Sequence, residues 1–195
     1  MSEKYFYHGS ISSNITKLKA SSLLHNTNKK VIYLTDNIPY ALLYIGDGKH
    51  NNYDRKFVTG WIKNGLACYE ELFPNQLEIF YKDISGYLYC IEKSLNISAV
   101  EDKESMYYSG TDIIADHADY ISDIYYELMK YEAAGKFKLF RFNEQPKERQ
   151  DMLINKSADI ITKSDFFKND EAKLNFYKKY FTLAWECAES KYEQK

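Results

Sequence analysis

Proline, tryptophan and cysteine are all scarce in this 195-residue chain, which has three, two and three of them, respectively. The cysteines, Cys68, Cys90 and Cys187, are odd in number and form no Cys-x-x-Cys pair. This spacing argues against a disulfide framework and against a zinc knuckle. We therefore expect three reduced thiols that pack as small apolar groups.

Long apolar runs and an excess of one charge are also missing. No run approaches the roughly 20 residues that span a bilayer, and no signal-peptide core follows the N-terminus. These absences predict a cytoplasmic protein with no membrane segment. The net charge is -2 and the isoelectric point is about 6.1, so no global positive field draws the chain to nucleic acid.

Tyrosine, in contrast, is abundant: there are 19, and hydrophobic residues make up 45% of the chain, enough for a core. The length suits one domain with an appended helical segment. From Ser157 onward the pattern is helical. One apolar stripe there contains Leu174, Tyr177, Phe181, Ala184 and Ala188. We expect a domain over residues 1–150 and a helical extension over residues 151–195 that packs on it.

Short apolar runs alternate with turn residues along the first half of the chain. Gly9 should end an aromatic strand, and the Asn-Gly pair at 64–65 should form the turn of a hairpin. Thr35 or Asp36 should cap the helix that carries Pro39 in its first turn. The expected elements are strands over residues 4–8, 31–34, 57–62 and 66–70, a turn and short helix within 11–24, and helices over 39–45 and 74–81.

The second half mixes strands and helices irregularly. Ile121, Ile124 and Leu128 fall at helical spacing, and Gly135 marks the end of that helix. The expected elements are strands over residues 86–91, 112–118 and 136–142, a polar loop over 92–110, a helix over 121–132 and helices from 157 onward. This order favours an α+β fold over a doubly wound sheet.

One group of residues could hold a ligand. His8 ends the first expected strand and is followed by Gly9 and Ser10, and Tyr33 and Tyr44 lie on the next strand and the helix after it. A glycine at a strand end allows close approach to the backbone, whose N–H and C=O can recognise an amide. Two tyrosine rings can stack on a planar group. Neither a Gly-x-Gly-x-x-Gly motif nor a P-loop is found in the sequence.

Together these segments resemble the His-Tyr-Glu branch of the ADP-ribosyltransferase superfamily, which includes poly(ADP-ribose) polymerases and diphtheria-type toxins. In the polymerases one strand ends in His-Gly-Ser or His-Gly-Thr, a second reads roughly Gly-Ile-Tyr-Phe-Ala-Asp, and a tyrosine follows on the next helix. Here residues 7–10 read Tyr-His-Gly-Ser and residues 31–36 read Val-Ile-Tyr-Leu-Thr-Asp, followed by Tyr44. The resemblance covers roughly residues 5–142. It implies an ADP-ribosyltransferase-like split β-sheet core with flanking helices and a C-terminal helix.

The resemblance also implies a role for each matching residue. NAD, as the substrate, would place a ribose hydroxyl on His8 and its carboxamide on the Gly9 backbone and the Ser10 hydroxyl. Tyr33 and Tyr44 would sandwich the nicotinamide ring. The implied reaction cleaves the nicotinamide–ribose bond and transfers one ADP-ribose to an unknown macromolecular acceptor, with His8, Tyr33 and an acid as the catalytic residues.

The acid is the third signature residue, a Glu that the family places at the start of a late strand facing the nicotinamide ribose. Asp119-Tyr120-Ile121 resembles this Glu-Tyr-Ile segment, so we expect Asp119 to be the acid. Glu127 is the alternative candidate for this acid. The third option is that the acid seen here is an ordinary surface residue without a catalytic role. A carboxylate there would stabilise the oxocarbenium-like centre.

Asp is shorter than Glu, and misplacement by about 1 Å can cost about 100-fold in rate. The alternative function is therefore a catalytically weak or inactive module of the same fold that binds NAD, ADP-ribose or a protein partner.

Two further interpretations fit less well. Asp116, His117 and Asp119 are close in sequence, but they lack the helical His pair of zinc sites and a neighbouring Cys, so no metal is expected. An RNA 2′-phosphotransferase of the same superfold would need basic residues that hold phosphates. We find no matching set of His and Arg residues.

Overall fold

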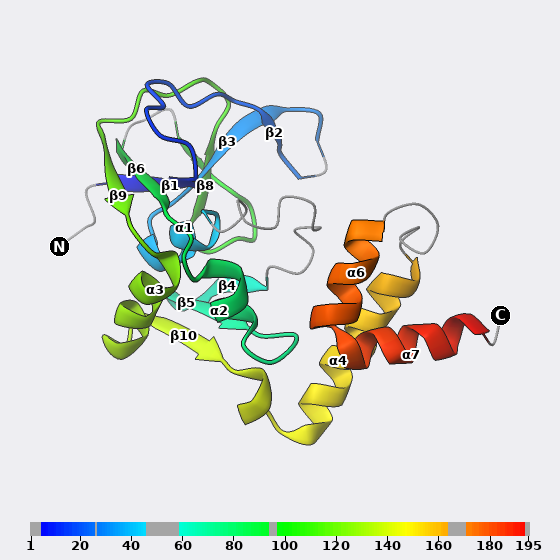
Figure 1. Cartoon of the computed structure of the whole chain (residues 1–195). Coiled ribbons are helices and arrows are strands. Elements are labelled where there is room, and N and C mark those ends of the chain that lie inside the picture. The colour runs from blue at the N-terminus through cyan, green and yellow to red at the C-terminus, as the bar shows by residue number, and fades with distance from the viewer. Residues whose placement is uncertain (1–4, 26, 46–58, 94–96, 164–170, 194–195) are drawn as a thin grey trace.

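A computed structural model of the chain describes residues 5–25, 27–45, 59–93, 97–163 and 171–193 (Figure 1). Parts of the expected elements lie outside these residues: Lys4, residues 57–58 and the glycine-containing segment at 46–48. The fold is α+β, with one large sheet, one small sheet and surrounding helices. In Figure 1 the large sheet and the C-terminal helices lie on opposite sides of the molecule.

The large sheet is antiparallel and has the strand order β7-β8-β3-β1-β6-β9, with β2 added beside β3. The strands are β1 (Tyr5–Ser10), β2 (Ser22–Leu23), β3 (Lys30–Thr35), β6 (Gly86–Glu92), β7 (Ser98–Ala99), β8 (Met106–Ser109) and β9 (His117–Ile121). β1 pairs with β6 along its whole length. Within the described residues β1 and β3 pair at one position, Tyr7 opposite Thr35. The sheet therefore opens between β1 and β3.

The small sheet is built on the expected hairpin. Its strands are β4 (Gly60–Lys63), β5 (Leu66–Glu70) and β10 (Phe137–Phe140). Asn64 and Gly65 have φ values of 52° and 74°, as a two-residue hairpin turn requires. The Glu104 carboxylate accepts hydrogen bonds from both of their N–H groups. β10 pairs with β5 in parallel, which a long crossover connection allows.

The helices are α1 (Ile38–Leu43), α2 (Gln76–Tyr81), α3 (Ile124–Ala133), α4 (Lys147–Lys163), α6 (Glu171–Tyr180) and α7 (Thr182–Glu193), with a 3₁₀ turn, η3, over Phe142–Glu144. Two of the helices, α1 and α3, begin at side-chain caps that accept from one of their first N–H groups. Asn37 caps α1 by accepting from the Tyr40 N–H at 3.0 Å. The prediction of Thr35 or Asp36 is wrong, because the Thr35 hydroxyl accepts from the Asn37 N–H instead.

Three expected elements differ from the structure because long-range pairing decides them. Residues 11–24 form no helix: Asn14 has a φ of 55°, and Leu18 forms a bridge to Ile113. The expected loop over 92–110 contains β7 and β8. The strand expected at 112–118 runs over 117–121, so Ile121 ends a strand instead of starting the next helix.

The C-terminal helices share the main hydrophobic core with α1, α2 and α3. α4 begins at Lys147 and therefore crosses the boundary expected at 150–151. The expected apolar stripe is buried at Tyr177, Phe181 and Ala184, but it turns at Phe181 from α6 into α7. The ring of Phe181 packs against Phe73, with the centroids 4.6 Å apart.

Hydrophobic length is the criterion for a membrane span. No helix in the described part of the chain is both long enough and apolar enough to meet it.

Leu128 on α3 is completely buried in this core, whereas Leu183 on α7 is 53% exposed. Leu128→Ala should lower the free energy of unfolding by about 2–5 kcal/mol, because it removes buried apolar contacts and leaves a cavity. Leu183→Ala should change it by no more than about 0.5 kcal/mol. Urea unfolding of both variants measures the difference. Equal losses would contradict this assignment of the core.

Candidate functional site

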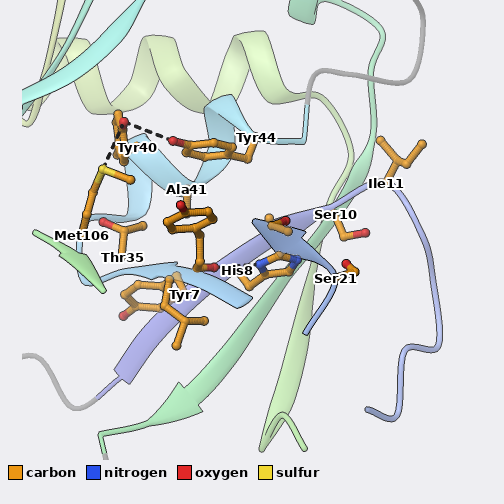
Figure 2. Close-up of a pocket in the computed structure, with 14 residues that line it drawn as sticks. Tyr7, His8, Ser10, Ile11, Ser21, Thr35, Tyr40, Ala41, Tyr44 and Met106 are labelled. Carbon is orange, nitrogen blue, oxygen red and sulfur yellow. Dashed lines mark hydrogen bonds between the residues drawn. The ribbon is translucent and has the colours of Figure 1, made fainter. Parts of the chain in front are cut away.

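A cavity of 320 Å³ lies where β1 and β3 separate (Figure 2). Its volume is at the lower end of the range of small-molecule sites, about 300–1,000 Å³. Its walls come from β1, β3, α1, the segment around β2 and the start of β8. The lining residues are Tyr7, His8, Gly9, Ser10, Ile11, Ser21, Ser22, Tyr33, Leu34, Thr35, Tyr40, Ala41, Tyr44 and Met106.

The five residues that the sequence singled out for ligand binding all line this cavity. They are His8, Gly9 and Ser10 on β1, Tyr33 on β3, and Tyr44 at the C-terminal end of α1. The fold thus brings together residues that are far apart in the chain.

His8 joins the two strands at the edge of the opening. Its Nδ1 lies 3.0 Å from the carbonyl oxygen of Tyr33. A carbonyl can only accept, so Nδ1 carries the proton of this bond. Burial lowers the pKa of His8, and the hydrogen bond to Tyr33 opposes that shift without reversing it. The lowered pKa favours the neutral imidazole, in which Nε2 is a hydrogen-bond acceptor.

Tyr33 is held at the end of its side chain. Its hydroxyl donates to the carbonyl of Leu23 at 3.0 Å and accepts from the N–H of His25 at 3.2 Å. Both contacts lie in the segment that adds β2 to the sheet. The phenol ring therefore has a fixed position in the cavity wall.

Tyr44 belongs to a short hydrogen-bonded chain that the sequence did not reveal. Its hydroxyl donates to the hydroxyl of Tyr40 at 3.1 Å, and Tyr40 donates to the Met106 sulfur at 3.7 Å (Figure 2). The two tyrosine rings are 5.4 Å apart at 80°. The spacing of four residues on one helix was the available signal for this pair. Because Tyr40 is buried and Tyr44 is 46% exposed, the inner ring supports the outer one.

Gly9 has a structural role in addition to the one expected of it as part of the cavity lining. A Cβ at this position would lie 2.3 Å from the carbonyl oxygen of Ala41 and 2.8 Å from Cγ1 of Ile45. The missing side chain therefore lets the end of α1 approach β1. The space next to the Gly9 Cα is filled by the protein itself.

The structure does not bring the expected acid to the cavity. Asp119 lies on β9 opposite Leu88, and β6 separates β9 from β1. Glu127 lies on α3 and forms an ion pair with Lys130 at 2.7 Å. Among the described residues that line the cavity there is no Asp or Glu.

Met106 is a cavity residue that the sequence did not indicate. It is the first residue of β8, a strand late in the chain, and it pairs with Thr35 on β3. Both side chains line the cavity. The sequence predicted a polar loop for this segment, although its Met-Tyr-Tyr run has the residue composition typical of a strand.

Comparisons with protein-family models, with curated proteins and with solved structures found no match for the chain. The class that the structure itself defines is an α+β domain with a tyrosine-rich cavity in the opening of its main sheet.

Gly9→Ala should lower the free energy of unfolding by about 1–3 kcal/mol, because the added methyl group meets the backbone of α1. Gly110→Ala is the matched control: its Cβ would meet Cε of Lys29, the movable end of a long side chain. Thermal or urea unfolding measures both. A Gly9→Ala variant as stable as the Gly110→Ala control would contradict the packing role of Gly9.

Proposed function

We propose that this chain is an ADP-ribosyltransferase-type domain that binds the nicotinamide and adjoining ribose of NAD in the cavity between β1 and β3. One observation carries the proposal: His8, Gly9, Ser10, Tyr33 and Tyr44, which match the NAD-binding positions of that family, line one cavity. The opening between β1 and β3 is consistent with the split sheet that the resemblance implies.

The hydrogen-bonding groups of the cavity suit this ligand. Nε2 of neutral His8 would accept a hydrogen bond from a ribose hydroxyl. The Ser10 hydroxyl accepts from the N–H of Ser12 at 3.1 Å, so its proton can donate to the carboxamide oxygen. The rings of Tyr33 and Tyr44 supply flat apolar surface for the nicotinamide.

Cleavage of NAD makes a further demand, because positive charge develops on the ribose. Removing one preorganised stabilising group from a reaction centre typically costs about 2.7–4 kcal/mol, or 100- to 1,000-fold in rate. The described lining of the cavity includes no carboxylate. We therefore favour a module that binds NAD or ADP-ribose and cleaves the nicotinamide–ribose bond of NAD only slowly.

ADP-ribosyl transfer to a macromolecule is the second candidate. The observation in its favour is that the NAD-contacting positions, including His8, meet in one cavity. It requires an acid that reaches the ribose. Asp119 lies outside the described lining of the cavity, so it could have this role only if it reaches the ribose once NAD is bound; Asp119→Asn should then abolish nicotinamide release without weakening NAD binding. If the domain is a binding module, Asp119→Asn should change neither.

Titration calorimetry with NAD tests binding. The native chain should bind NAD. Tyr44→Ala should weaken binding about three- to tenfold, because one face of the nicotinamide ring loses its aromatic partner. His8→Ala should also weaken it, through the lost acceptor. Tyr126→Ala is the control, since Tyr126 is 55% exposed on α3. No binding by the native chain, or equal affinity in all four proteins, would refute the site.

Met106→Glu tests the missing acid directly. Met106 starts β8 beside the Tyr33 strand and lines the cavity, so a carboxylate at this position would lie next to the bound ligand. The substitution should raise the rate of nicotinamide release from NAD at least tenfold. Met106→Gln, of equal size and uncharged, should not. If both variants bind NAD and release nicotinamide at the native rate, Met106 does not occupy the position of the acid.

A further inference from the structure

A second group of reactive side chains lies on the large sheet, outside the lining of the cavity. Cys90 on β6 and His117 and Asp119 on β9 bring their ligand atoms within 4.8 Å of one another. The Cys90 sulfur is 3.8 Å from Oδ2 of Asp119, and Nε2 of His117 is 3.9 Å from the same oxygen. Thiolate, imidazole and carboxylate are the side chains that coordinate zinc in proteins.

Sheet register produces this grouping. Cys90 lies directly opposite His117, and Asp119 follows His117 by two residues, so all three side chains share one face of the sheet. The sequence hid this arrangement, because Cys90 is on a different strand from the other two. The expectation of no metal rested on the lack of a helical His pair and of a cysteine or second histidine nearby along the chain.

Neighbouring contacts fix the backbone of the group. The N–H of Asp116 donates to the carbonyl of Cys90 at 2.9 Å, and the Asp116 carboxylate accepts from the N–H of Glu92 at 2.7 Å. These bonds hold the start of β9 against β6. The ring of His117 packs edge-on against Tyr5, with the centroids 5.2 Å apart. Partners outside the ligand set commonly orient metal ligands in this way.

Two of the three distances between the ligand atoms are close to those around a tetrahedral metal ion. Zinc lies about 2.3 Å from sulfur and about 2.0–2.2 Å from nitrogen and oxygen, so tetrahedral geometry places the ligand atoms about 3.4–3.6 Å apart. The separations from Oδ2 of Asp119 to the Cys90 sulfur, 3.8 Å, and to Nε2 of His117, 3.9 Å, are somewhat longer than this, and the third separation is at most 4.8 Å. The side chains of His117 and Asp119 are 46% and 61% exposed, so small rotations of both can close the difference.

We propose that Cys90, His117 and Asp119 form a zinc site, with the fourth coordination position open to water. Three protein ligands and one open position are typical of catalytic zinc sites, whereas structural zinc sites have four protein ligands. The thiolate and imidazole select zinc over magnesium or calcium, which prefer oxygen ligands. The site shares no residue with the described lining of the cavity proposed for NAD.

Titration with Co²⁺ as a spectroscopic substitute for Zn²⁺ tests the site in the full chain. One Co²⁺ should bind per chain and give the visible bands of tetrahedral cobalt, together with a thiolate-to-metal charge-transfer band. One equivalent of Zn²⁺ should abolish both. His117→Ala and Asp119→Asn should each weaken binding at least tenfold. Cys90→Ser should remove the charge-transfer band.

His25→Ala and Cys187→Ser are the matched controls, because His25 is exposed and Cys187 lies on α7, and both should bind as the native chain does. The proposal is overturned if the native chain binds no Co²⁺ stoichiometrically or if His117→Ala binds as tightly as the native chain. It is equally overturned if the charge-transfer band disappears in Cys187→Ser. The exposed position of His117 keeps the test valid should Cys90→Ser fail to fold.

Discussion

The hydrogen bond between His8 and the carbonyl of Tyr33 is the constraint on which the candidate site depends. β1 and β3 pair at Tyr7 and Thr35 and then separate, and this bond spans the two strands next to the point of separation. It fixes the tautomer of the imidazole and directs Nε2 away from the backbone. A sheet that paired fully here would have no cavity. A sheet without the bond would leave the position of His8 undefined.

Helix α1 covers the opening, and two contacts hold it there. At its C-terminal end the Ala41 carbonyl and the Ile45 side chain occupy the space above Gly9, which only glycine leaves empty. The hydroxyl of Tyr81 donates to the carbonyl of Leu43 at 2.9 Å and ties the helix to α2. Leu42 and Leu43 belong to the main core, which the C-terminal helices complete. The position of Tyr44 at the cavity therefore depends on packing that extends to the far side of the molecule.

The parts of this structure that the sequence predicted are those decided by local chemistry. The Asn-Gly turn at 64–65 specifies its hairpin through positive φ, and Pro39 marks the first turn of α1. The His-Gly-Ser segment and Tyr33 were visible because each belongs to a short motif. β8, and with it Met106, was not, because pairing with β3 defines that strand. The distance of Asp119 from the cavity was not predictable either, because it depends on β6, the strand that pairs with β9.

One sheet thus carries two separate groups of candidate functional side chains. Tyr7, which lines the cavity, is the register partner of Cys90, and Cys90 is the partner of His117.

A crystal structure of the chain soaked with nicotinamide would test the central claim most directly. The account predicts a ring stacked between Tyr33 and Tyr44, with its carboxamide at Gly9 and Ser10. An empty cavity at saturating nicotinamide, or a ring bound elsewhere on the surface, would contradict it.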